Sequence, residues 1–168
     1  TIVGSTSFSI NPGNYQDVTV RFTPTSATIY NAMLHINNNS AESIKEVPLT
    51  GTGTSNAISL SLNLIDFNSV ALGNTSDKTL RISNPGTATL QVSGMSITNA
   101  AFAVIGVNSF NIEAGAYQDV TVRFAPSSAI SYNATLRINN NSAESVKEVT
   151  LKGTGTIGAI SLSASSID

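Results

Sequence analysis

Hydrophobic and polar residues alternate along several short stretches of the chain. In residues 117–124, Val120, Val122 and Phe124 fall on one face of an extended strand, and polar residues fall on the other. The same two-residue period recurs in residues 78–83, 89–93, 134–138 and 147–151. No stretch has a helical period, and Gly, Pro and Asn turns separate the stretches. This pattern predicts an all-β fold, an antiparallel β-sandwich.

The chain repeats its own sequence at a constant offset of 102 residues. Residues 8–54 return as residues 110–156, and 34 of the 47 aligned positions are identical. Such a gap-free offset indicates tandem modules. Residues 57–66 match 159–168 at the same offset. We therefore expect three segments: the C-terminal half of one repeat (1–55), a complete repeat (56–157) and the first strand of a further repeat (158–168).

The half-repeat needs complementing strands, because residues equivalent to 57–101 do not precede it in this sequence. Without them, the sequence predicts open strand edges and an uncovered apolar face. That face comprises Val18, Val20, Phe22, Leu34, Ile36, Val47 and Leu49. Either the preceding part of a longer array supplies the strands, or a neighbouring molecule donates one, and both routes produce a fibre. The candidates for strand donation are Ile160, Leu162 and Ile167.

A Gly-Thr-Gly sequence closes each repeat. Its glycines are Gly51, Gly53, Gly153 and Gly155. Only a few residues separate this sequence from the next strand, so we expect these glycines to be inter-module joints that hold successive modules at a near-fixed angle. An array of such modules should behave as a stalk.

Composition narrows the classes of partner and location. The net charge of −2 is spread without runs, so there is no basic face for a nucleic acid. Charged residues make up 11% of the chain, and Ser, Thr and Asn take the polar places, which favours an extracellular or cell-surface location. The absence of cysteine excludes thiol catalysis, thiolate metal sites and disulfides. No apolar run approaches the roughly 18 residues that a membrane span needs.

Catalytic and metal-binding residues are not indicated. The single histidine, His35, aligns with Arg137 in the second repeat, and a general base or metal ligand is not expected to alternate with arginine. No hydrolytic triad can be assembled without another histidine or a nucleophile-elbow motif. The carboxylates form no calcium-loop motif, and Asp66, the one junction candidate, has a simpler interpretation as a turn residue. We predict a non-enzymatic protein with no cofactor and no metal.

Tyrosines and asparagines recur at matching positions of the two repeats. Tyr15 aligns with Tyr117 and Tyr30 with Tyr132, and we expect these rings to pack at strand ends rather than form a sugar-binding platform. Four Asn-X-Ser/Thr sequons are candidate glycosylation sites, although chance in an Asn-rich sequence explains them equally well. They are Asn38, Asn74, Asn133 and Asn140.

The order of motifs within one repeat carries a family resemblance. An Ile-Asp-Phe strand start (65–67) is followed by an Asn-Pro-Gly turn (84–86), a Phe-Ala-Pro step (124–126) and a Leu-Lys-Gly-Thr-Gly close (151–155). Together these motifs resemble the ASH or hydin-like family, whose prokaryotic relatives are the choice-of-anchor D repeats of surface proteins. The resemblance implies tandem immunoglobulin-like sandwiches, related to major sperm protein and pilus-chaperone domains, that serve scaffolding and adhesion without catalytic residues.

Two functional hypotheses follow. The first is a structural tandem-repeat module of an extracellular stalk, adhesin or filament, which assembles head to tail with other copies or adjacent repeats, with strand donation as one means of completion. The alternative is an extracellular module that recognises a glycan, protein, cell-surface or matrix ligand through loops such as 143–146. A cytoplasmic ciliary scaffold and an accessory domain of a secreted enzyme remain open. The loop sequence Asn-Asn-Asn-Ser-Ala-Glu-Ser is unchanged between repeats, which favours the structural hypothesis.

Overall fold

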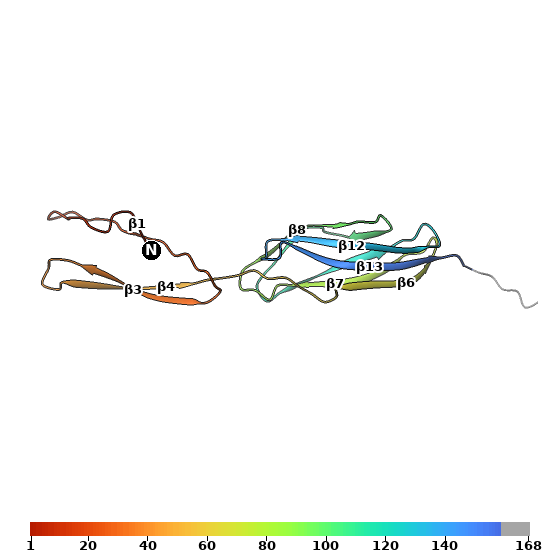
Figure 1. The fold of residues 1–168 in the computed structure, drawn as a ribbon, viewed down its shortest axis with the longest axis horizontal. Helices are drawn as coiled ribbons and strands as arrows, with labels where there is room; N and C mark the ends of the chain where they lie inside the picture. The colour runs from red at the N-terminus through yellow and green to blue at the C-terminus, as the bar shows by residue number, and fades with distance from the viewer. Residues whose placement is uncertain (159–168) are drawn as a thin grey trace, which may run out of the picture. The chain divides into compact units, whose positions relative to one another are not determined.

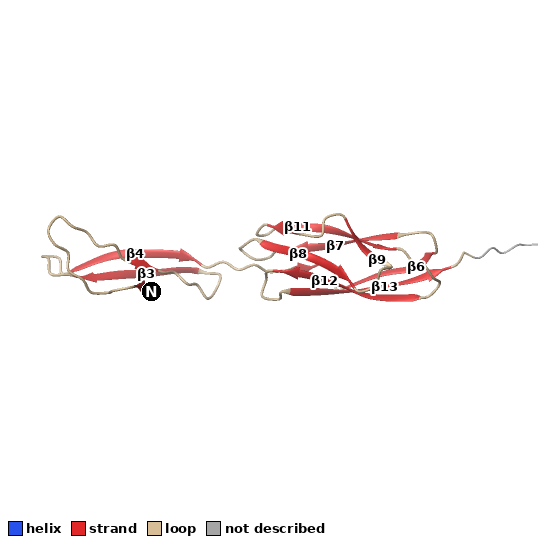
Figure 2. Ribbon diagram, turned by 90° about the horizontal axis from the view of Figure 1, so that it is seen from above, coloured by secondary structure: helices blue, strands red, loops and turns tan. Residues whose placement is uncertain are grey.

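The computed structural model describes residues 1–158, in which every regular element is a β-strand (Figure 2). The chain divides into two compact units, unit 1 (Thr1–Ser55) and unit 2 (Asn56–Asp168). Within residues 1–158 there is no helix long and apolar enough to span a membrane. The all-β prediction is confirmed.

Unit 2 is a sandwich of two sheets (Figure 1). One sheet has the strand order β10-β8-β12-β13-β6, and the other has the order β5-β7-β11-β9. Neighbouring strands pair antiparallel, apart from β6 and β13, which run parallel. The strands are β5 (Ser59–Leu60), β6 (Leu64–Ala71), β7 (Ser76–Ser83), β8 (Leu90–Ile97), β9 (Phe102–Ile105), β10 (Phe110–Ile112), β11 (Tyr117–Phe124), β12 (Ser131–Asn140) and β13 (Val146–Thr156).

The parallel ladder joins the start of unit 2 to its end. Its first pair is Leu64 with Thr150 and its last is Ala71 with Thr156, and a bulge interrupts the register between these pairs. At the bulge Asn68 has a φ of 55°, and its backbone N–H donates to Asp66 Oδ1 over 2.8 Å. Asp66 thus shapes a local bend by accepting a backbone hydrogen bond, which confirms the simpler interpretation of this residue.

The core of unit 2 forms where the alternating strands of the two sheets face each other. Val120, Val122 and Phe124 of β11 are at most 4% exposed, so the predicted inward face is correct. Phe124 lies at the centre of an aromatic cluster, 4.6 Å from Phe102 and 5.6 Å from Phe67 between ring centroids. Burial of such rings contributes hydrophobic free energy and specific ring geometry to the sandwich.

A buried asparagine closes the turn between β7 and β8. Asn84 is 1% exposed, and its Nδ2 donates to Ala88 O over 2.8 Å and to Ile112 O over 2.9 Å. Its Oδ1 accepts from Gly86 N over 2.9 Å. The sequence predicts a turn here, but the burial of Asn84 and its bond to β10 depend on the tertiary fold.

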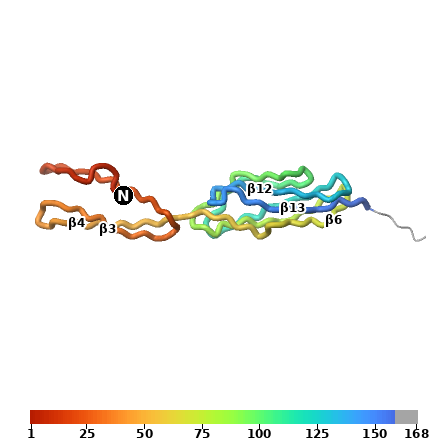
Figure 3. Tube along the Cα trace, in the orientation of Figure 1, coloured from red at the N-terminus to blue at the C-terminus, as the bar shows by residue number. Residues whose placement is uncertain are grey.

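Unit 1 has four strands, which form two two-stranded sheets. The strands are β1 (Ile2–Val3), β2 (Thr19–Val20), β3 (Ile29–Asn37) and β4 (Ile44–Thr52). Strands β3 and β4 run side by side as a hairpin (Figure 3). Every pairing has a counterpart in unit 2 at an offset of 102 residues: β1–β2 matches β9–β11, and β3–β4 matches β12–β13. The two units therefore share one strand register wherever both contain the strands.

The four glycines predicted as joints lie at or within the last strand of each unit. A Cβ on Gly153 would lie 2.5 Å from the Phe124 ring, and one on Gly155 would lie 2.0 Å from Ser128 O. Gly51 and Gly53 make equivalent approaches in unit 1, at 2.9 Å and 2.0 Å. Glycine is required there because the neighbouring atoms occupy the space of a side chain. Their role as inter-module joints stays a prediction.

Candidate functional site

The candidate site is an uncovered apolar face in unit 1. Phe22 is 49% exposed and Val47 is 42% exposed, whereas their counterparts Phe124 and Val149 are both 0% exposed. Val18, Val20 and Ile36 have similar exposure to Val47. Leu34 and Leu49, predicted for the same face, are half-buried. Complete burial of the five exposed residues would contribute about 4 kcal/mol.

Unit 2 shows which strands complete the two sheets of the sandwich. Strand β6 pairs with β13, β8 with β12 and β7 with β11. All three covering strands lie in residues 56–102, which we call the covering segment (yellow to green in Figure 1). Residues 1–55 contain counterparts of β9, β11, β12 and β13, and among the described residues no strand pairs with the outer edges of β3 and β4.

Two bidentate ion pairs join the covering segment to β11. Arg81 Nε and Nη2 donate to the two carboxylate oxygens of Asp119 over 2.8 and 2.9 Å. Arg123 donates in the same way to Asp77, over 2.8 Å for both bonds. These hydrogen bonds hold the pKa of the Asp77 and Asp119 carboxyls below the ordinary value. The two pairs have opposite polarity along β7 and β11, so they favour one register of the strands.

Unit 1 contains counterparts of the two residues that β11 contributes to these ion pairs. Asp17 and Arg21 occupy the positions of Asp119 and Arg123, and neither makes an ion pair with another of the residues 1–158. A strand with an aspartate and an arginine four residues apart, like β7, has the charges that complement them. Sequence reasoning missed this pattern, although the repetition of Asp and Arg at offset 102 was visible.

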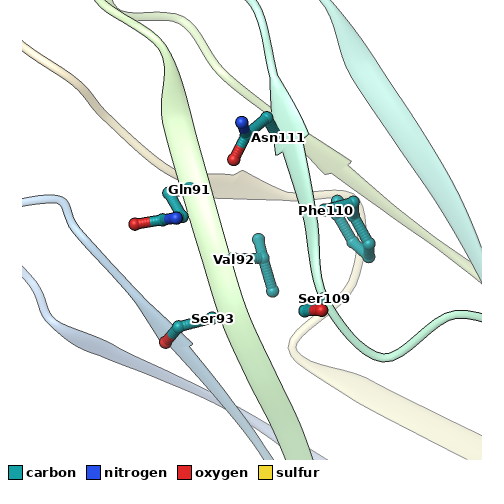
Figure 4. A pocket seen from close by; sticks show the side chains of 6 residues that line it. All are labelled: Gln91, Val92, Ser93, Ser109, Phe110 and Asn111. Atoms are coloured by element: carbon teal, nitrogen blue, oxygen red, sulfur yellow. The ribbon is translucent and has the colours of Figure 1, made fainter.

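Two surface depressions, both in unit 2, are lined by few charged or reactive side chains. One of about 350 Å³ lies over the β8–β10 pair and is lined by uncharged groups, including Gln91, Ser93 and Asn111 (Figure 4). A second, of about 510 Å³, is lined by residues 58–63 together with Lys147 and Glu148. Among the described residues, no three His, Asp or Glu side chains gather into a group that could hold a metal ion.

His35 lies on the exposed surface of β3. Its Nδ1 is 3.1 Å from Glu46 Oε1, and in unit 2 Arg137 Nε is 3.0 Å from Glu148 Oε1. His35 in unit 1 and Arg137 in unit 2 thus make equivalent cross-strand pairs, each with a glutamate. Such exposed pairs contribute little to stability.

The two tyrosine pairs differ in environment. Tyr132 is 9% exposed, its ring meets Phe124 edge-on, and Ser128 N donates to its hydroxyl over 2.8 Å, so the packing prediction is correct for it. Tyr117 is 56% exposed and carries the Arg81 guanidinium 3.7 Å above its ring. Tyr15 is 84% exposed. The packing prediction is therefore wrong for Tyr15 and Tyr117.

The four sequon asparagines also differ in environment. Asn74 lies in an exposed turn and Asn133 on the exposed face of β12. Asn140 is 8% exposed, and its Nδ2 donates to Ile138 O and Glu144 O over 3.2 and 3.0 Å. An amide held in this way does not offer its nitrogen to a glycan in the folded unit. Asn38 makes the equivalent bond to Ile36 O at a half-buried position.

The family follows from a sequence comparison. The model for “Abnormal spindle-like microcephaly-assoc'd, ASPM-SPD-2-Hydin”, or ASH, matches residues 55–146, more than half of the chain. The chain belongs to the ASH family. The ASH match spans β5 to the start of β13 and therefore includes the covering segment. No curated protein sequence matches the chain.

Solved structures share the ASH fold at low sequence identity. The ASH/PapD-like domain 7 of human CEP192 is 19% identical, with a TM-score of 0.55, over 62% of this chain and 89% of that one. A Porphyromonas gingivalis W83 protein of unknown function is 14% identical, with a TM-score of 0.54, over 82% and 70%. A Clostridium perfringens family 123 glycoside hydrolase is 10% identical, with a TM-score of 0.51, over 62% and 27%. These likenesses confirm the immunoglobulin-type, PapD-like sandwich.

Proposed function

We propose that this chain is a structural tandem-repeat part of an extracellular stalk, adhesin or filament, and that it is not an enzyme. The observation that carries the proposal is the common register of the two units at an offset of 102 residues. The features held in common are strand pairs, core positions, close-packed glycines and one loop. These features serve packing and assembly, as expected of modules made in copies.

The uncovered face of unit 1 is completed, in this proposal, by a second covering segment. That segment would place a β6-type strand along β4, a β8-type strand along β3 and a β7-type strand along the extended chain at residues 15–22. The apolar residues would then be buried as in unit 2, and Asp17 and Arg21 would gain partners of opposite charge. Charge and apolar surface support the same occupant, a strand segment from a repeat of this kind.

Donation of the last ten residues alone would leave most of this face open. Ile160, Leu162 and Ile167 lie outside the described residues, and they align with Ile58, Leu60 and Ile65 of unit 2. Residues 57–66 supply only β5 and the start of β6 in that unit. The counterparts of β7 and β8 must come from a longer segment, so we favour completion by a whole covering segment over donation of a single strand.

The alternative function, recognition of a glycan or protein ligand, has less support. An exposed aromatic ring is the usual platform for a sugar, but the Tyr117 ring has the Arg81 guanidinium over one face at 3.7 Å. The depression over β8 and β10 has no charged residue in its lining. A glycan array that gave saturable binding, lost in Tyr117→Ala, would favour this alternative.

Electron microscopy of cells that make the protein tests the proposed function directly. With antibodies raised against unit 2, we expect label on intact cells along thin surface fibres or stalks. Label that appears only after the cells are permeabilised would contradict the extracellular location. Compact labelled particles would contradict the stalk or filament.

A graft tests completion of unit 1 by the covering segment. Because Thr1 aligns with Ala103, a copy of residues 56–102 placed directly before Thr1 creates two complete modules with unbroken register. In this grafted chain Asp17→Arg should lower the folding equilibrium constant of the first module about fivefold, and Arg81→Asp in the grafted copy should restore it.

The matched control is the same Asp17→Arg substitution in the chain without the graft, where we expect no change in unfolding. If the substitution is neutral in the grafted chain, or if Arg81→Asp makes it worse, the proposed pairing is wrong. These outcomes are independent of the cellular location, which only the labelling experiment addresses.

A further inference from the structure

We propose that unit 2 is a load-bearing element, in which the parallel pair β6–β13 resists force applied along the chain. This property goes beyond the proposed structural role, because a repeat can act as a spacer without resisting tension. It is carried by strand topology within one unit, and it does not depend on how unit 1 is completed.

The direction of the two strands determines how tension acts on their hydrogen bonds. Strand β6 is the first long strand of the unit and β13 is the last, and the two run parallel from Leu64 opposite Thr150 to Ala71 opposite Thr156. Tension pulls β6 back at its first residue and β13 forward at its last. The two strands are therefore sheared along their length, so all the ladder bonds carry load together. In an antiparallel terminal pair, the same tension would act at one end and open the bonds one at a time.

Hydrogen bonds mark both ends of the sheared ladder. Thr150 N donates to Asn63 O over 3.0 Å at one end, and Leu72 N donates to Thr156 O over 2.8 Å at the other. Strand β5, which precedes the ladder, has only two residues paired with β7. We expect β5 to detach first and the tension then to pass to Asn63 and β6.

Side chains add to the resistance. Ile65 and Phe67 of β6 are 2% and 3% exposed, and the Phe67 ring lies 5.6 Å from both Phe102 and Phe124 between centroids. Sliding β6 past β13 therefore also withdraws Phe67 from the aromatic cluster. The loss of this packing coincides with the loss of the hydrogen bonds, which makes the rupture cooperative.

Unit 1 has a proline at the position of the residue that donates the first hydrogen bond of the β6–β13 ladder in unit 2. The residue equivalent to Thr150 is Pro48, which has no N–H, and β4 keeps the register of β13 around it, with Pro48 opposite Met33. Proline at this position is thus compatible with the strand. It removes the donor that in unit 2 bonds to Asn63 at the first end of the ladder.

Single-molecule force spectroscopy on the full chain tests the proposal. The chain has no cysteine, so pairs of introduced thiols define where force acts. Asn63→Cys with Ile157→Cys loads β6–β13 in shear, and Asn74→Cys with Ile157→Cys pulls on one end of the ladder. All three positions are exposed. We expect a severalfold higher unfolding force for the shear pair at equal loading rate, with a length gain of roughly 30 nm for its 94-residue separation.

Two variants separate the ladder from general stability. Thr150→Pro should lower the unfolding force for the Asn63–Ile157 thiol pair, which loads the ladder in shear. It should leave the unfolding force for the Asn74–Ile157 pair unchanged, because pulling on that end of the ladder opens the hydrogen bond from Thr150 N to Asn63 O last. Thr98→Ala removes the hydroxyl that accepts from Thr135 N over 3.0 Å, away from the ladder, and should leave the shear force unchanged. Equal forces for the two thiol pairs would overturn the proposal. So would an equal loss of shear force in Thr150→Pro and Thr98→Ala.

Discussion

The substitution Asn84→Ala probes the tertiary packing that turns a strand pair into a sandwich. It removes three hydrogen bonds, two donated to the carbonyls of Ala88 and Ile112 and one accepted from Gly86 N. Each bond has a net value of about 1 kcal/mol, and Ile112 O loses a partner inside the protein, so we expect a loss of about 3 kcal/mol. For a unit of this size the melting temperature should fall by about 15 °C.

Differential scanning calorimetry of the full chain measures this change through the transition of unit 2. The matched control is Asn111→Ala, at an exposed position of the neighbouring strand β10, which we expect to change the melting temperature by only a few degrees. Asn84→Asp keeps the acceptor but loses the donors, and it should be less damaging at pH 4 than at pH 7, because a protonated carboxyl can donate. If Asn84→Ala lowers the melting temperature no more than Asn111→Ala, the role assigned to this residue is wrong.

Three further predictions concern packing and charge in unit 2. Gly155→Ala places a Cβ 2.0 Å from a backbone oxygen and should cost about 3 kcal/mol in chemical denaturation, whereas Gly94→Ala, with no atom within 4 Å of its Cβ, should be close to neutral; equal effects would contradict the packing. Tyr132→Phe leaves the part-buried backbone N–H of Ser128 without its acceptor and should cost about 1 kcal/mol by the same measurement, and no loss would contradict the assigned bond. The arginine hydrogen bonds lower the pKa of Asp77 and Asp119, so their stabilisation is present above about pH 4 and is lost below it as the carboxylates bind protons. The double variant Asp77→Asn, Asp119→Asn should therefore weaken the fall in melting temperature between pH 4 and pH 2.5, and an unchanged acid profile would contradict this assignment.

The sequence was sufficient for features that local periodicity and self-similarity determine. The alternation in residues 117–124 predicts both the bounds of β11 and its buried face, since a half-buried strand must present every second side chain to the core. The offset of 102 residues predicts that the two units share a register, because equal sequences make equal strand pairs.

Features that depend on distant segments were beyond the reach of the sequence. The parallel pairing of β6 with β13 is an example, because no local signal distinguishes a parallel neighbour from an antiparallel one. The ion pairs of Asp77 with Arg123 and of Arg81 with Asp119 join residues directly opposite each other, so they required the β7–β11 register. The burial of Asn84 likewise required the position of β10, since an Asn-Pro-Gly turn by itself is usually solvated.

Hydrogen exchange in the grafted chain tests whether residues 1–55 are the second half of an ASH module. The backbone amides of Val20 and Phe22 are compared with those of Val122 and Phe124, with and without the grafted copy of residues 56–102. We predict rapid exchange of Val20 and Phe22 without the graft, and protection close to that of Val122 and Phe124 with it. Continued rapid exchange of Val20 and Phe22 in the grafted chain, with unit 2 fully protected, would contradict the claim.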